Sequence, residues 1–344
     1  MAIMKAAVLT EPYHIEYKDV PKPVPGPGEL LIKTCYAGIC GSELHAYKGL
    51  HKKRVPPVIM GHETSGIVEE LGEGVSRFKT GDRVTAVPMY GCGHCPECFR
   101  GETSLCSSKT IFGSQKWPGG YAEYCVVPAH LAYMLPDNVS MQDGALIEPL
   151  AVGLHAVRTA KISAGDKVTV LGSGAIGLCT AIMAARAGAV PLICTDVQEF
   201  NLERAMTMGA THTLDARDPE LVEKVLEISD GGCDVVFVTA PVNALVNQAI
   251  AMTRKQSQVI CVAMFDTDAL VNVEMNRARE TMITGTSMYY EEDFARIIRM
   301  LDHGKLDTSG MVTHELPMSE ADDAFQMYMN RVPGIVKILS LIHI

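Results

Sequence analysis

The feature that most constrains the fold is an alternation of short apolar segments with helical ones after residue 167. Segments such as KVTVLG, PLICTD and CDVVFVTA are strongly apolar, and helix-like stretches such as AIGLCTAIMAARAG separate them. Strands of a parallel sheet that is covered on both faces are apolar along their length, and helices connect them. This part of the chain therefore predicts an α/β domain made of βαβ units with a buried parallel sheet.

A glycine pattern follows the first of these predicted strands. In VTVLGSGAIGL the glycines form G-x-G-x-x-G at the start of a helix. The first permits a tight turn, the second lets the backbone approach a pyrophosphate, and the third lets helix and strand pack closely. The pattern predicts a dinucleotide site at Gly172, Gly174, Ala175, Ile176 and Gly177.

An acidic residue ends the next predicted strand. Asp196 lies 19 residues beyond Gly177, where a carboxylate accepts hydrogen bonds from the adenosine ribose and repels a 2′-phosphate. This favours NAD over NADP. The alternative is that the glycines serve ordinary helix packing and that Asp196 is only a helix cap.

The first 150 residues have a different sequence pattern. Short β-branched runs, such as residues 30–33 and 83–87, are separated by segments rich in Pro and Gly such as VPKPVPGPGE. This pattern is typical of a compact, irregular β domain. A chain of 344 residues exceeds the usual size of one hydrophobic core, so two domains are expected.

Four cysteines stand close together in YGCGHCPECFRGETSLC, with the spacing C-x2-C-x2-C-x7-C. Four thiolates at such spacing make a closed tetrahedral zinc site, which has no position for a substrate and stabilises structure. The alternative is four reduced cysteines on the surface. The predicted ligands are Cys92, Cys95, Cys98 and Cys106.

Composition limits the partners. The formal charge of −10 and the absence of long basic runs argue against nucleic acid and anionic membranes, and favour a small-molecule substrate. No apolar run reaches the roughly 18 residues of a membrane span, and the first residues do not form a secretory signal. Eleven cysteines, several in apolar runs, indicate a reducing compartment, so we expect a cytoplasmic protein.

Three further fragments, taken together, suggest a catalytic metal site: GICGSELH, MGHE and ALIEPLAVGLHA. A glutamate among apolar residues, such as Glu148, needs a partner, and a metal ion is one. The Cys40 thiolate, the His62 imidazole and one or two carboxylates from Glu63 and Glu148 would make an open catalytic zinc site.

Taken together, these motifs make the chain resemble the zinc-dependent medium-chain dehydrogenases of the alcohol dehydrogenase superfamily over essentially its full length. GHE followed by IEPLAVGLHA, together with FGSQKWPGGYAEY, resembles the polyol or sorbitol dehydrogenase branch. The resemblance implies a GroES-like catalytic domain at residues 1–149, a Rossmann domain at 150–287, and a segment at 288–344 that returns to the first domain. It also implies a homodimer or homotetramer, through strands near residues 258–264 and 281–286.

The resemblance also assigns roles. It implies that Cys40, His62 and Glu63 bind the catalytic zinc, with Glu148 either a ligand or joined through water. Ser42 would accept the substrate hydroxyl proton and His45 would pass it to solvent. Family members often carry Lys or Arg five residues after the ribose aspartate, where this chain has Asn201, which agrees with NAD.

The predicted function is therefore zinc- and NAD-dependent oxidation of a secondary alcohol of a polyol or sugar alcohol, which could carry a phosphate, with two zinc ions per subunit. An L-threonine 3-dehydrogenase or a 2,3-butanediol dehydrogenase would use the same ligands. A dinucleotide-binding sensor that has lost the chemistry is the alternative outside the enzymes, since fold alone does not establish activity.

Overall fold

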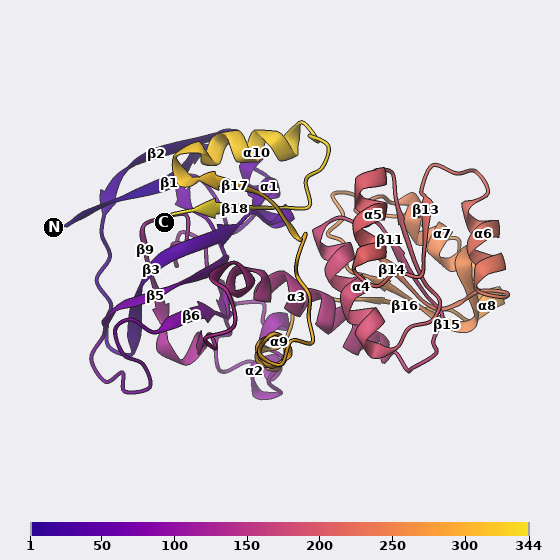
Figure 1. Ribbon diagram of the computed structural model, residues 1–344, viewed down its shortest axis with the longest axis horizontal. Helices are drawn as coiled ribbons and strands as arrows, with labels where there is room; N and C mark the ends of the chain where they lie inside the picture. The colour runs from indigo at the N-terminus through magenta and orange to yellow at the C-terminus, as the bar shows by residue number, and fades with distance from the viewer. Residues whose placement is uncertain (1, 343–344) are drawn as a thin grey trace. The chain divides into compact units, whose positions relative to one another are not determined.

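The computed structural model describes residues 2–342, and the chain forms two compact units (Figure 1). One unit contains the chain up to Glu148 and again from Tyr290, and the other is Pro149–Tyr289. The boundaries expected from the sequence were 149/150 and 287/288. Across residues 2–342, no helix is long and apolar enough to cross a membrane.

The Pro149–Tyr289 unit is built on six parallel strands in the order β13-β12-β11-β14-β15-β16. This is the doubly wound order of a dinucleotide-binding fold, so the predicted Rossmann arrangement is confirmed. The strands are β11 (Val168–Leu171), β12 (Leu192–Asp196), β13 (His212–Asp215), β14 (Cys233–Val238), β15 (Thr253–Cys261) and β16 (Met282–Gly285). The helices are α4 (Ala175–Ala187), α5 (Glu199–Thr207), α6 (Leu221–Ile228), α7 (Ala244–Met252) and α8 (Val273–Arg279).

Burial explains why these apolar runs form central strands. All four residues of β11 are buried, and five of the six residues of β14 are. Side chains from both faces therefore leave water, as expected for a parallel sheet between helix layers. Helix α4 ends at Gly188, whose φ of 94° is the left-handed conformation that glycine adopts readily at a helix end.

The other unit is built on a mostly antiparallel sheet of seven strands, in the order β10-β6-β5-β3-β18-β17, with β9 also paired to β3. Its strands are β3 (Glu29–Gly38), β5 (Glu63–Leu71), β6 (Arg83–Ala86), β9 (Tyr124–Pro128), β10 (Ala132–Met134), β17 (Val312–Pro317) and β18 (Lys337–Leu341). A smaller sheet holds β1 (Ile3–Glu11), β2 (His14–Pro21) and β4 (Val58–Ile59), and a third pairs β7 (Met89–Tyr90) with β8 (Thr110–Ile111).

The helices of this unit are α1 (Gly41–Tyr47), α2 (Pro96–Phe99), α9 (Glu291–Asp302) and α10 (Ala321–Met329), and α3 (Met141–Ala160) runs through the boundary at Glu148. Part of the core is aromatic: Tyr47 and Tyr121 both pack on Phe325 of α10, with ring centroids 5.0 and 6.0 Å away. These contacts bring a late helix against α1, the helix that follows Cys40.

The late strand β18 lies inside the large sheet and not at its edge. It pairs antiparallel with β3 through residues 339–341, and parallel with β17 on its other side (Figure 1). The last described residues of the chain therefore complete the sheet that carries the candidate site.

Candidate active site

Strand pairing brings three candidate ligands together. Cys40 follows the end of β3 and precedes α1, whereas His62 and Glu63 stand at the start of β5. Because Gly38 pairs with Glu63 in the ladder of β3 and β5, the three side chains converge. Their ligand atoms all lie within 4.8 Å of one another.

This donor set fits a catalytic zinc ion. One thiolate, one imidazole and one carboxylate are common zinc ligands, and three protein ligands leave the fourth tetrahedral position for water or substrate. His62 is 5% exposed and Glu63 is fully buried, whereas Cys40 is partly exposed. Cys40 is therefore the one of the three ligands that is not withdrawn from solvent.

Glu43 on α1 fixes the orientation of His62, a role that was not predicted for this residue of the fragment GICGSELH. Its Oε1 lies 2.7 Å from Nδ1 of His62 and also accepts from the backbone N–H of Gly61 at 2.8 Å. Its Oε2 accepts from the Tyr121 hydroxyl at 2.6 Å and from the Cys40 N–H at 3.2 Å. The signal in the sequence was the carboxylate three residues after Cys40, since a ligating histidine normally has a carboxylate or carbonyl partner.

Glu43 is a carboxylate at neutral pH. Burial by itself raises its pKa, but the charge and hydrogen bond of His62, with the charge of Arg54, outweigh burial and lower the pKa to about 2. A carboxylate has no proton to donate, so Nδ1 of His62 must carry the shared hydrogen. The Nε2 nitrogen is then the one with a lone pair for a metal ion.

Lys337 on β18 contacts the third candidate ligand, a contact that was not predicted from the sequence. Its ammonium donates to both oxygens of Glu63 at 2.8 Å and to the Ile39 carbonyl at 3.0 Å. A carboxylate has about four lone-pair positions, so Glu63 can accept from Lys337 and still bind a metal. The signal was one lysine inside the apolar run GIVKILSLI, because a buried charge needs a partner.

Glu148 does not belong to this cluster within residues 2–342. It lies on α3 and is 5% exposed. The cluster that can bind a metal here consists of Cys40, His62 and Glu63. A role for Glu148 at the zinc ion, as a direct ligand or through water, stays a prediction.

Ser42 and His45 both lie on α1, but no hydrogen bond joins them in the part of the chain that the structure describes. The Ser42 hydroxyl accepts instead from Nη1 of Arg54 at 2.9 Å. The His45 ring is 6.5 Å from that of His51, at 78° to it. A proton relay from Ser42 to His45 therefore requires an intervening group.

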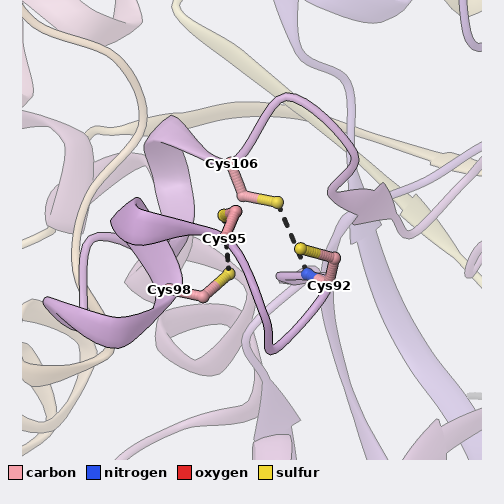
Figure 2. Close-up of side chains that lie close together, drawn as sticks. All are labelled: Cys92, Cys95, Cys98 and Cys106. Atoms are coloured by element: carbon pink, nitrogen blue, oxygen red, sulfur yellow. Dashed lines mark hydrogen bonds between the residues drawn. The ribbon is translucent and has the colours of Figure 1, made fainter.

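The four-cysteine cluster lies on the loop that contains α2, and the four sulfurs face one another (Figure 2). The Cys95 and Cys98 sulfurs are 3.4 Å apart, and the Cys92 N–H donates to the Cys106 sulfur at 3.4 Å. Four thiols converging within 4.8 Å fit one tetrahedral zinc ion with no open position.

The glycine loop has the geometry that a dinucleotide needs. Gly172 has φ of 99°, and a Cβ at Gly177 would overlap the Gly172 carbonyl, so both are required by the turn itself. A Cβ at Gly174, in contrast, meets no atom within 4 Å. The protein leaves space over Gly174, at the start of α4, where a pyrophosphate would lie. Ala175 and Ile176 form the first turn of that helix and are partly exposed.

The predicted ribose carboxylate lies at the end of β12, on the neighbouring strand. Asp196 accepts from the Ser173 N–H at 2.8 Å and from the Gln198 N–H at 2.9 Å, which fixes it against the glycine loop. Asn201 is 4% exposed, and its Oδ1 has no hydrogen-bond partner among the described residues. Asn201 is thus a buried, neutral residue of α5 and offers no positive charge to a 2′-phosphate.

Two family models match this chain: the alcohol dehydrogenase GroES-like domain over residues 26–137, and the zinc-binding dehydrogenase over residues 175–303. A sorbitol dehydrogenase of Halalkalibacterium halodurans is 34% identical over 328 residues, which cover 94% of this chain and 95% of that protein. The chain belongs to the zinc-dependent medium-chain dehydrogenases. It is an alcohol dehydrogenase, and the family, fold and enzyme class predicted from the sequence are confirmed.

Other members of the family are similar over most of their length. An L-idonate 5-dehydrogenase of Vitis vinifera is 33% identical over 311 residues, covering 88% of this chain and 85% of that protein. The structure of a putative zinc-binding dehydrogenase from Sinorhizobium meliloti, bound to NADP, has a TM-score of 0.93 and 32% identity, and the match covers 99% of this chain and all of that one.

Proposed function

We propose that this dehydrogenase oxidises a secondary alcohol of a polyol or sugar alcohol to the ketone, with NAD⁺ as acceptor. The observation that carries the proposal is the convergence of Cys40, His62 and Glu63 within 4.8 Å, with one ligand position open. The relatives support a polyhydroxy substrate, since sorbitol and L-idonate dehydrogenases are among them.

The reaction removes a hydride from the carbinol carbon and a proton from the hydroxyl, giving the ketone, NADH and H⁺. A zinc ion bound by Cys40, His62 and Glu63 would supply Lewis acidity at the hydroxyl oxygen. Ser42 would accept the hydroxyl proton, and His45 would release it to solvent through an intervening hydroxyl or water. Glu43 would keep His62 in its ligating tautomer.

The preference for NAD⁺ rests on Asp196. A carboxylate fixed beside the glycine loop would bind the ribose hydroxyls and repel a 2′-phosphate. The similar Sinorhizobium meliloti structure contains NADP, so a preference for NADP⁺ is the competing outcome. The second zinc ion of each subunit would be bound by Cys92, Cys95, Cys98 and Cys106.

We also propose a cytoplasmic homodimer or homotetramer. Strand β16 is an outer strand of its sheet, and its residues Met282 and Ile283 are 60% and 38% exposed. An exposed apolar edge strand pairs readily with another chain. The cysteines of the described residues are all free thiols, which suits a reducing compartment.

The test is NAD⁺ reduction by the zinc-loaded protein with polyols, polyol phosphates, inositols, 2,3-butanediol and L-threonine, and with Cys40→Ala as the inactive control. A clear preference for a polyol or its phosphate supports the proposal. A preference for 2,3-butanediol or L-threonine would assign the alternative enzyme. If the protein binds zinc and NAD⁺ but reduces NAD⁺ with none of these compounds, the proposed function is contradicted.

A further inference from the structure

Two segments near Ser42 carry positive charge and no acidic residue, in a chain whose net formal charge is −10. Residues 44–62 and residues 103–122 contain no Asp or Glu. Their cations are Lys48, Lys52, Lys53 and Arg54 in the first segment, and Lys109 and Lys116 in the second. We call Lys53, Arg54 and Lys109, which lie where the two segments meet, the basic cluster.

Hydrogen bonds to carbonyl groups hold the two segments together. Arg54 donates from Nε to the Gly113 carbonyl at 3.1 Å and from Nη2 to the Phe112 carbonyl at 3.2 Å. Lys53 donates to the Lys109 carbonyl at 2.7 Å. Every one of these acceptors is neutral, so the contacts fix the cations in place without cancelling their charge.

Arg54 is a buried cation without an ion pair. It is 4% exposed, and within residues 2–342 no carboxylate lies within salt-bridge distance of Arg54, Lys53 or Lys109. Arginine is rarely buried without a paired charge, because desolvating a charge is costly. Its bonds to Gly113, Phe112 and Ser42 use three of its five N–H groups, so two remain for an anion.

The charge of Arg54 acts on the candidate active site. Its Nη1 lies 2.9 Å from the Ser42 hydroxyl, and Ser42 is two residues from Cys40. The nearby His51 ring adds no charge at neutral pH, because burial first, and then the charge of Arg54, lower the pKa of His51 to about 4. The Nδ1 atom of His51 accepts hydrogen bonds from the backbone N–H groups of Lys53 and Arg54, at 3.1 and 3.0 Å.

We infer that the substrate is an acidic polyol, an open polyhydroxy chain with a carboxylate or phosphate group, and that the basic cluster selects it. This inference rests on the proposed function and narrows its substrate class. Arg54 would set the specificity, since it combines a buried position with a bond to Ser42. Carboxylate and phosphate each present two neighbouring oxygens, which a guanidinium binds with two parallel hydrogen bonds.

The first experiment compares three substrates that share one carbon chain length. The zinc-loaded enzyme with NAD⁺ is given glucitol, gluconate and glucitol 6-phosphate, and kcat/KM is measured for each. We expect at least one of the two anions to exceed glucitol by about 30-fold or more, the effect of one charge-assisted hydrogen bond. The better of the two anions identifies the group as carboxylate or phosphate.

Substitutions at Arg54 and Lys53 test whether these two residues cause the preference for an anionic substrate. Arg54→Met and Lys53→Gln should each lower the ratio of kcat/KM for the preferred anion to that for glucitol, and added salt should lower it further. Lys53 is on the surface, so Lys53→Gln tests the inference even if Arg54→Met fails to fold. Lys305→Gln is the matched control, because Lys305 is exposed in the same unit and should leave the ratio unchanged.

The outcomes separate the two proposals. Oxidation of glucitol as efficient as that of both anions would overturn the basic-cluster inference and leave the polyol dehydrogenase intact. An anion preference that survives in both Arg54→Met and Lys53→Gln would also overturn it. Lack of turnover with all three compounds, and with the wider polyol panel, would overturn the proposed function and this inference with it.

Discussion

The ammonium of Lys337 lies 2.8 Å from both carboxylate oxygens of Glu63, and the two side chains are only 2% and 0% exposed. This ion pair links β18 to the first residue of β5, directly beside His62. Removing one partner of a buried pair leaves the other charge without compensation. The pair therefore couples the fold of the sheet to the candidate metal site.

We expect Lys337→Met to destabilise the zinc-free protein by about 3 to 5 kcal/mol, the usual cost of breaking a buried pair. Zinc should restore part of this loss, because the metal would replace the ammonium as the positive partner of Glu63. Chemical unfolding of the zinc-free and zinc-loaded forms measures both effects. Lys305→Met, at an exposed position, is the control, and an equal loss with and without zinc would contradict the coupling.

Glu43→Gln should weaken binding of the catalytic zinc by about 10-fold to 100-fold, because it removes the charge that holds His62 in place. Competition with a chromogenic chelator measures the affinity directly. Tyr121→Phe is the matched control, since Tyr121 bonds the other oxygen of Glu43 and not His62. Unchanged zinc affinity in Glu43→Gln would show that Glu43 has only a structural role.

Cys40→Ala should abolish turnover and leave the fold intact, because it removes one of three ligands at an open site. Activity, zinc content and circular dichroism together test this. Retained activity in Cys40→Ala would remove Cys40 from the catalytic site.

Cys98→Ser should lower the melting temperature and remove one zinc ion per subunit, because a closed site contributes its binding free energy to folding. Metal analysis and thermal unfolding check it. Cys261→Ser, a half-buried cysteine outside both clusters, should retain the parent's zinc content. The interpretation fails if Cys98→Ser melts and binds metal as the parent does.

Asp196→Ala should reduce the preference for NAD⁺ over NADP⁺, because it removes the charge that repels the 2′-phosphate. The ratio of kcat/KM for the two cofactors is the measurement. Asp166→Ala is the control, since Asp166 also accepts a backbone N–H in the same unit but lies before β11. An unchanged ratio in Asp196→Ala would remove Asp196 from cofactor selection.

Local patterns were sufficient to predict the architecture. The apolar strands, the glycine loop and the four-cysteine spacing each lie within a short stretch of chain, so their meaning does not depend on distant residues. The order of the six parallel strands then follows from the general preference for doubly wound connections. The separate fragments around Cys40 and His62 were also recognisable, because their residue types suit zinc.

The sequence could not show which partners complete the site from far along the chain. Lys337 is 274 residues from Glu63, and no local pattern pairs them. The contact of Arg54 with Ser42 likewise depends on how residues 51–54 pack on residues 112–113. No role was predicted for Glu43 because a glutamate on a short helix is most often exposed, whereas the fold buries it completely.

The position of β18 has a consequence for biosynthesis. Residues 337–341 are synthesised after every other strand of the large sheet, yet they pair with β3 in the middle of it and supply the cation that neutralises Glu63. The Pro149–Tyr289 unit, whose strands are all contiguous in the chain, can fold while synthesis continues. The zinc site beside Glu63, in contrast, lacks its neutralising cation until residues 337–341 have been synthesised, so we expect metal to be loaded only after β18 has joined the sheet.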